Sequence, residues 1–361
     1  MPINVSARLY ELFNAVNIAG YYNTKQEPVR PYLGATLFPP TEVVGRKLSF
    51  ITGRAGAPIA LRASALDANA PLRSPIPLNV VEAEMPFFRE GMQIKESIMM
   101  DLAVALQTTN EALWRPYIEK AYDGAYDLIL GADATVERMR MALLSTGVIN
   151  ILDEKDNVPI DIDYGFDTAS QMTTLAGTAM WSNTATSDPM GDLEKAMIAA
   201  NIGSARVIMT RATFNMMRAS EKLRGNIFVG GVSPATVTPQ QVQDYFSANY
   251  DFAFTILEPR QNNYRLAWDA PTADIRKFFP DGVASVVQGG VTLGETVYGS
   301  TPEGLTADME GAQTEIVNTG VAVRTYTTPH TVNVNTVVSE TVLPSFPEIG
   351  SLHIINAYTP A

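Results

Sequence analysis

The chain has 361 residues, of which 46% are hydrophobic and 18% are charged, and its formal net charge at pH 7 is −12. This negative charge argues against a general nucleic-acid binder, and the absence of cysteine excludes disulfides and thiolate metal sites. No run of about eighteen apolar residues predicts a membrane span. The length suits one large domain or two to three smaller ones.

The charges are unevenly spread along the chain. Residues 1–100 carry ten Lys and Arg side chains against eight Asp and Glu, whereas the remainder carries sixteen against thirty. A basic segment attached to an acidic body favours docking onto another copy, although a solvated loop without a partner is the alternative. Our candidates for charged inter-subunit contacts are the basic residues of the segment 46–73, namely Arg46, Lys47, Arg54, Arg62 and Arg73.

The first 33 residues have the pattern of an arm. A short amphipathic piece that includes Leu9, Leu12 and Phe13 leads into a polar stretch ending at Pro31. A segment this short has no core of its own, so its apolar side chains need another surface.

Residues 43–92 are typical of a long two-stranded excursion. Val43–Thr52 is predicted as the outgoing strand and Val80–Phe88 as the return strand, because apolar and polar residues alternate in both. The intervening residues 63–77 are small, polar and contain prolines. The segment has too little apolar surface for a separate domain, so we expect it to project and to rest on something else.

Residues 109–146 predict one very long helix. Apolar residues recur there at steps of three or four, and Gly147 suits the C-terminal cap. At 1.5 Å per residue the helix would span roughly 57 Å, with Gly124 and Gly131 as candidate bends.

The rest of the chain predicts further hairpins and a mixed α/β region. Residues 148–164 form a hairpin pattern. Residues 185–311 alternate helical and strand-like segments, with a helix predicted over Ala212–Leu223 and further helices predicted to start at Asp188-Pro189 and Thr238-Pro239. The C-terminal 50 residues are rich in β-branched residues and end in a short strand at Leu352–Asn356.

Catalytic and metal-binding motifs are absent from the sequence, and we predict no catalytic, cofactor-binding or metal-ligating residue. There is no G-x-S-x-G elbow and no phosphate-binding P-loop. The two histidines, His330 and His353, are expected to be packing residues. The best metal candidates are Asp161, Asp163 and Asp167, but Met172 occupies the place of the glutamate that a calcium loop needs, so a solvated strand edge is the preferred interpretation. An α/β enzyme with an unrecognised carboxylate pair remains the less favoured alternative.

Six segments resemble the phage major capsid protein E family in family order. They are RKLSFITGRAGAPIALRA (46–63), ERMRMALLSTGVINI (137–151), RVIMTRATFNMM (206–217), FFPDGVASVV (278–287), YGSTPEG (298–304) and VNVNTVVSETVLPSFPEIGSLHIINAY (332–358). The resemblance implies an α+β fold, the tailed-phage major capsid fold, and a shell-forming role without enzymatic activity. An encapsulin-like compartment shell, which shares this fold, is the alternative.

The resemblance also implies a division of the chain. We expect an N-terminal arm at 1–33, an extended loop at 34–92, a peripheral domain with a spine helix at 93–168 and 312–345, and an axial α/β domain at 169–311 and 346–361.

Assembly partners follow from the same resemblance. We expect pentamers and hexamers that enclose double-stranded DNA without sequence-specific binding, a separate scaffolding protein, a portal and a possible decoration protein, in a virion assembled in a bacterial cytoplasm. Some relatives of this fold join subunits through Lys–Asn isopeptide bonds from a loop lysine. Residues 48–94 contain no lysine, so we predict a non-covalent shell.

Overall fold

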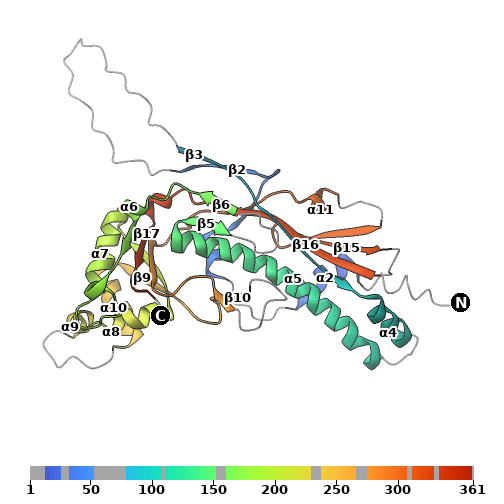
Figure 1. Ribbon diagram of the computed structural model, residues 1–361, viewed down its shortest axis with the longest axis horizontal. Helices are drawn as coiled ribbons and strands as arrows, with labels where there is room; N and C mark the ends of the chain where they lie inside the picture. The colour runs from blue at the N-terminus through green and yellow to red at the C-terminus, as the bar shows by residue number, and fades with distance from the viewer. Residues whose placement is uncertain are drawn as a thin grey trace, which may run out of the picture. The chain divides into compact units, whose positions relative to one another are not determined.

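The computed structural model describes residues 13–25, 32–52, 79–106, 111–151, 160–228, 237–265, 275–306, 311–328 and 333–359. The chain divides into two compact units, each built from several segments. Figure 1 labels the helices and strands of the chain. Unit 1 comprises Met1–Leu48, Glu84–Arg140 and Glu295–Ser345, and unit 2 comprises Ser49–Ala83, Met141–Gly294 and Phe346–Ala361.

Unit 1 contains a six-stranded sheet in the order β1-β13-β16-β15-β14, with β4 also paired to β16. Its strands are β1 (Pro40–Glu42), β4 (Phe87–Ile94), β13 (Thr296–Tyr298), β14 (Ala312–Val317), β15 (Val321–Thr328) and β16 (Asn333–Pro344). Its shorter helices are α2 (Ala15–Thr24), α3 (Leu33–Leu37), α4 (Glu96–Leu106) and α11 (Pro302–Leu305).

The predicted long helix is confirmed as α5 (Glu111–Thr146), whose residues up to Arg140 belong to unit 1. Its 36 residues give a length of about 54 Å. Gly124 and Gly131 do not divide it, and at Gly124 an added Cβ would overlap with the Met92 side chain of β4. This glycine therefore allows a close approach between the helix and the sheet of unit 1.

The helix ends where the sequence predicted. The Gly147 amide donates to the Leu143 carbonyl at 2.9 Å, and Gly147 has φ +78°. An added Cβ would overlap with the Phe166 ring, so both the backbone conformation and the packing require glycine.

Unit 2 is built on a five-stranded sheet in the order β7-β17-β12-β8-β9. One of its hydrophobic clusters includes Trp181, Phe214 and Phe246, none of which is exposed. Its sheet strands are β7 (Met172–Thr174), β8 (Ala205–Thr210), β9 (Phe252–Leu257), β12 (Val283–Gln288) and β17 (His353–Asn356), and the helices are α6 (Thr168–Gln171), α7 (Pro189–Ala200), α8 (Arg211–Ala219), α9 (Glu221–Ile227) and α10 (Pro239–Tyr250). Unit 2 also contains two strand pairs, β5 (Val148–Ile151) with β6 (Ile160–Asp163) and β10 (Asn263–Arg265) with β11 (Ile275–Lys277), and two 3₁₀ turns at Gly177–Ala179 and Ile349–Ser351.

Three predicted elements were wrong in their extent. The strand predicted over Val43–Thr52 begins only at Lys47, in β2 (Lys47–Thr52), because Gly45 turns the chain at φ +106°. The return strand predicted over Val80–Phe88 is two strands, β3 (Asn79–Glu84) and β4, with Met85 and Pro86 between them. The helix predicted over 212–223 is split at Ser220 into α8 and α9.

Candidate functional site

The paired strands β2 and β3 form a hairpin whose root lies in unit 1. We define the hairpin root as Pro40–Lys47 together with Glu84 and Met85. Strand β1 pairs in parallel with β13, and the Val43 amide donates to the Tyr298 carbonyl at 2.8 Å. The chain therefore enters the hairpin from a strand that is part of the sheet of unit 1.

Two reciprocal hydrogen bonds fix the turn of the hairpin root. The Gly45 amide donates to Ser300 Oγ at 3.2 Å, and the Ser300 amide donates to the Gly45 carbonyl at 3.0 Å. An added Cβ at Gly299 would overlap with the Gly45 carbonyl and would come within 2.5 Å of Met85 Cε. Only glycine at 299 allows the root to lie this close to the sheet.

Arg46 joins the two sides of the hairpin root. Its guanidinium contacts the Glu84 carboxylate at 2.7 Å, and its carbonyl accepts a hydrogen bond from the Met85 amide at 2.8 Å. Both charged side chains are more than 60% exposed, so the ion pair contributes little to stability and leaves the guanidinium accessible.

The structure describes two of the five predicted contact residues. Lys47 is exposed at the start of β2, next to Arg46 in the chain. Arg54, Arg62 and Arg73 lie outside the described residues. The structure therefore brings Arg46 and Lys47 together at the hairpin root and gives no arrangement for the other three.

Apolar side chains are exposed beside these two cations. Val44 is fully exposed, Val43 is 36% exposed and Phe87 is 37% exposed. The Arg89 guanidinium lies over the Phe87 ring at 4.8 Å. Our sequence interpretation missed these exposed apolar residues, although a pair of valines directly before a turn glycine is a visible signal of exposed apolar surface.

The described part of the N-terminal arm packs onto the α5 helix of its own chain. Phe13, Ala15 and Ile18 are buried, and the Tyr21 ring stacks on Tyr122 of α5 with centroids 5.2 Å apart. The surface that the arm was predicted to need is thus supplied, for residues 13–25, by unit 1 itself.

Polar contacts to Asp123 also hold the arm on this helix. Lys25 forms an ion pair with Asp123, and Tyr21 donates to the same carboxylate at 2.7 Å. The hydrogen bond from Lys25 lowers the pKa of the Asp123 carboxyl most, and the hydrogen bond from Tyr21 lowers it further. Tyr21 belongs to α2, Lys25 directly follows it and Asp123 belongs to α5, so together these groups hold the arm against the helix.

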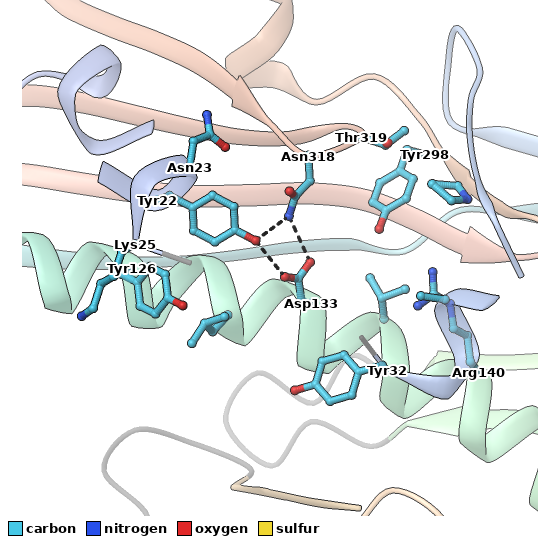
Figure 2. Close-up of a pocket in the computed structure, with 14 residues that line it drawn as sticks. Tyr22, Asn23, Lys25, Tyr32, Tyr126, Asp133, Arg140, Tyr298, Asn318 and Thr319 are labelled. Atoms are coloured by element: carbon cyan, nitrogen blue, oxygen red, sulfur yellow. Dashed lines mark hydrogen bonds between the residues drawn. The ribbon is translucent and has the colours of Figure 1, made fainter. Parts of the chain in front are cut away.

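A cavity of about 530 Å³ lies between the arm and α5 (Figure 2). Tyr22 donates to Asp133 at 3.3 Å, and the Asn318 amide donates to Tyr22 at 2.9 Å and to Asp133 at 3.3 Å. Burial raises the pKa of Asp133. The hydrogen bonds from Tyr22 and Asn318 and the charge of Arg140 oppose this rise. Its lining residues include neither a serine nor a histidine, so they do not form a serine–histidine pair.

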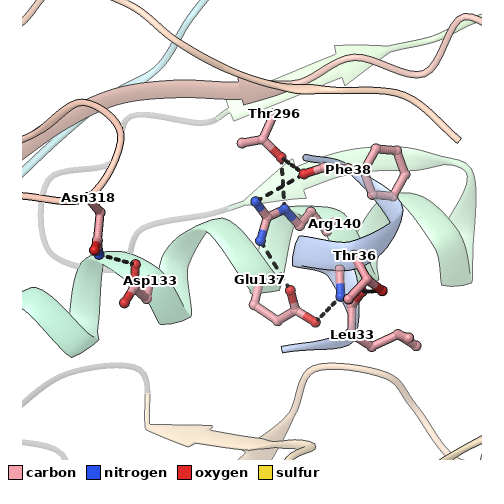
Figure 3. A network of polar contacts seen from close by, with 9 residues as sticks. Leu33, Thr36, Phe38, Asp133, Glu137, Arg140, Thr296 and Asn318 are labelled. Atoms are coloured by element: carbon pink, nitrogen blue, oxygen red, sulfur yellow. Dashed lines mark hydrogen bonds and ion pairs between the residues drawn. The ribbon is translucent and has the colours of Figure 1, made fainter. Parts of the chain in front are cut away.

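Arg140 and Glu137 of α5 hold the segment that leads into the hairpin root (Figure 3). Arg140 donates to Thr296 Oγ1 at 2.9 Å, to the Phe38 carbonyl at 3.4 Å and to Glu137 at 3.5 Å. Glu137 in turn accepts from the Gly34 amide at 3.0 Å. Burial raises the pKa of Glu137, and the bond from Gly34 opposes that shift. These contacts connect α5, α3 and β13 in one buried polar network.

The metal candidates of the sequence are not assembled into a site. Asp161 and Asp163 are exposed on β6, and the Asp167 side chain accepts from the Ala169 amide as the N-cap of α6. Among the described residues no group of three acidic or histidine side chains could hold a metal ion. No helix in the described part of the chain is long and apolar enough to cross a membrane.

His353 is confirmed as a packing residue, and His330 lies outside the described residues. The His353 side chain is buried and shares a hydrogen bond of 2.9 Å with Thr173 Oγ1. Burial lowers the pKa of its imidazole, which favours the neutral form.

Comparisons with known proteins identify the fold. The prophage capsid protein of Escherichia coli CFT073, named as putative, is 13% identical, with a TM-score of 0.58, and the match covers 96% of this chain and 99% of that one. A phage-related protein of Bordetella bronchiseptica RB50 is 14% identical, with a TM-score of 0.51, and the match covers 95% and 97% of the two chains. A search of curated protein sequences gives no match.

The sequence itself decides the family. The family model described as phage major capsid protein E matches residues 14–356. This range includes the described arm, the hairpin root, α5 and nearly all of both units. The α+β fold and the capsid-shell role expected from the resemblance are confirmed, and the chain belongs to the phage major capsid protein E family.

Proposed function

We propose that this chain assembles into the pentamers and hexamers of an icosahedral shell around double-stranded phage DNA. Subunits are joined without covalent bonds, and the DNA is enclosed without sequence-specific binding. The division into arm (1–33), extended loop (34–92), peripheral domain (93–168 and 312–345) and axial domain (169–311 and 346–361) is part of this proposal.

The observation that carries the proposal is the fixed hairpin root, in a chain whose family model spans residues 14–356. Strand β1, the Gly45–Ser300 bonds and the Arg46–Glu84 pair hold this root on the sheet of unit 1. A projecting segment with a fixed root loses less conformational entropy when it binds a neighbour than one with a free root. The root therefore supports the use of 43–92 as a segment that lies over an adjacent subunit.

Charge supports the same arrangement. Arg46 and Lys47 are exposed at the root, and Arg54, Arg62 and Arg73 follow in a chain that is otherwise acidic. Opposite charges orient two surfaces as they meet, and many weak contacts per subunit add through multivalency. The five cations accordingly contact acidic surfaces of neighbouring subunits.

Other proteins take part in this assembly. A separate scaffolding protein and a portal act with the chain in the bacterial cytoplasm, and a decoration protein is a further candidate because the shell has no covalent joints. The product is the virion capsid.

Negative-stain electron microscopy of the purified chain tests the proposal. We expect capsomers, sheets, tubes or closed shells. A small, monodisperse species by size-exclusion chromatography at the same concentration contradicts shell assembly. Shells that copurify with a protein cargo instead of DNA favour the encapsulin-like alternative.

A further inference from the structure

Glu340 of β16 is a buried carboxyl group that has no hydrogen-bond partner among the described residues. The residue is 1% exposed, and none of the described residues donates a hydrogen bond to either of its side-chain oxygens. An ionised carboxylate in such a place loses its hydration without compensation, which is among the most expensive arrangements in a protein. The position therefore favours the neutral acid.

The strand pattern places Glu340 on the face that meets α5. Val334 packs in one cluster with Ile118 of α5. Thr336 is in register with Met92, whose side chain reaches Gly124 of α5. Side chains alternate along a strand, so Glu340 belongs to the same row. The row consists of Val334, Thr336, Val338, Glu340 and Val342, and each of these residues is at most 4% exposed.

Glu303, another buried glutamate of unit 1, has partners that Glu340 lacks. Glu303 is 6% exposed, but it forms an ion pair with Arg89 and accepts a hydrogen bond from Ser339 Oγ at 2.7 Å. Ser339 precedes Glu340 in the strand and faces the other way. A buried carboxyl group therefore has an ion pair and a hydrogen bond on one face of β16, whereas the carboxyl group of Glu340 on the other face has no hydrogen bond from the described residues.

Among the described residues, three titratable groups interact electrostatically with Glu340. They are Asp133 and Arg140 of α5 and Tyr298 of β13. Arg140 is engaged with Thr296, the Phe38 carbonyl and Glu137, and Asp133 adds a like charge. Burial raises the pKa of Glu340 well above its ordinary value, Asp133 raises it further, and Arg140 opposes both.

We propose that Glu340 is a proton-operated switch in unit 1. Its carboxyl group is neutral in the folded chain, and loss of its proton loosens β16 from α5. The unfolded chain ionises at the ordinary pKa of glutamic acid, below that of the folded chain. The stabilising effect of the proton is therefore complete at acidic pH and is lost as the pH rises through the folded value. This property belongs to the folded chain itself and does not depend on the shell.

The first test compares the wild type with Glu340→Gln, which keeps the shape but cannot ionise. Glu90→Gln is the matched control, because Glu90 is exposed on β4 and in register with Val338. We expect the folding constant of the wild type, relative to Glu340→Gln, to fall by up to about tenfold per pH unit as the pH is raised from 5. The control should follow the wild type, and parallel curves for wild type and Glu340→Gln overturn the proposal.

The second test reads the proton directly and does not require the glutamine variant to fold. Infrared spectroscopy of the wild type at pH 7 should show the carbonyl band of a protonated carboxylic acid. Subtracting the spectrum of Glu340→Leu, which removes the carboxyl group and suits an apolar site, assigns the band. The band should disappear at alkaline pH together with protection of the β16 amides from hydrogen exchange. If the wild type and Glu340→Leu show the same band at pH 7, Glu340 is ionised and the switch does not exist.

Discussion

Gly34 lies directly against the side chain of Glu137. Its amide donates to Glu137 Oε1 at 3.0 Å, and an added Cβ would overlap with that carboxylate and come within 2.6 Å of Arg140 Cδ. Because Glu137 and Arg140 connect α5 to α3 and β13, the segment leading into the hairpin root depends on this one glycine.

Gly34→Ala should therefore destabilise unit 1. The new methyl group has to displace a buried, hydrogen-bonded pair, and overpacking of this kind costs about 1–3 kcal/mol. Thermal or denaturant unfolding of the purified chain measures the loss.

Gly20→Ala is the matched control for this change. Gly20 lies inside the α2 helix, and nothing is within 4 Å of its added Cβ. Alanine should stabilise the helix there by about 0.5–1 kcal/mol. Equal effects of the two substitutions would show that the Glu137 contact does not restrict residue 34.

Charge reversal at Arg54 or Arg62 should impair assembly more than folding. If these residues contact an acidic neighbour, glutamate at either position replaces attraction by repulsion between subunits. Particle yield by sedimentation, together with the circular dichroism spectrum of the unassembled chain, separates the two effects.

The control for charge reversal is Arg260→Glu. Arg260 is exposed in the turn between β9 and β10, away in sequence from the basic segment, and carries the same change of charge. Its particle yield should stay close to that of the wild type. Wild-type yield from Arg54→Glu and Arg62→Glu as well would remove these residues from the proposed contacts.

The elements that the sequence predicted well are those with strong local signals. The α5 helix follows from its period and from Gly147 at its end. The starts of α7 and α10 follow from Asp188-Pro189 and Thr238-Pro239, and the latter forms a complete capping box. Such signals lie within a few residues of the element that they define.

The features that the sequence did not predict depend on long-range packing. Glu340 lies in a run of alternating strand residues, where a glutamate is ordinarily read as solvent-facing, and only the approach of α5 buries it. The predicted return strand continues through Pro86 because its two halves, β3 and β4, have the same local pattern. They differ only in their partners, which are β2 and β16. Strand β4 pairs with β16, about 250 residues away in the sequence.

Stability should decrease at mildly acidic pH because of His353. Burial lowers the pKa of its imidazole below the ordinary value, so the unfolded chain takes up a proton before the folded chain does. The stabilising effect of the neutral form is present above the ordinary pKa of about 6.5 and is lost as the pH falls through the folded value.

The measurement compares the wild type with His353→Gln between pH 7.5 and pH 5. Glutamine can keep a hydrogen bond to Thr173 but does not titrate. The folding constant of the wild type should fall relative to the variant by up to about tenfold per pH unit. Stability is lost here as the pH falls, whereas the loss expected from Glu340 occurs as the pH rises. His353→Gln and Glu340→Gln therefore report on opposite sides of the curve of stability against pH. Identical pH curves would contradict a role for the histidine.

Mature particles should contain no covalent joints between subunits. An isopeptide bond of the kind found in some relatives needs a lysine on the projecting loop, and residues 48–94 have none. The nearest lysines, Lys47 and Lys95, are both exposed, but they lie at the start of β2 and directly after β4. Denaturing gel electrophoresis of particles should give one band near the 39.2 kDa of the monomer. A ladder of linked subunits would refute this, and loss of the ladder in Lys47→Arg would then identify the residue responsible. If the single band is found, the particles should also dissociate in denaturant without reduction or proteolysis, because non-covalent contacts are all that denaturant has to break.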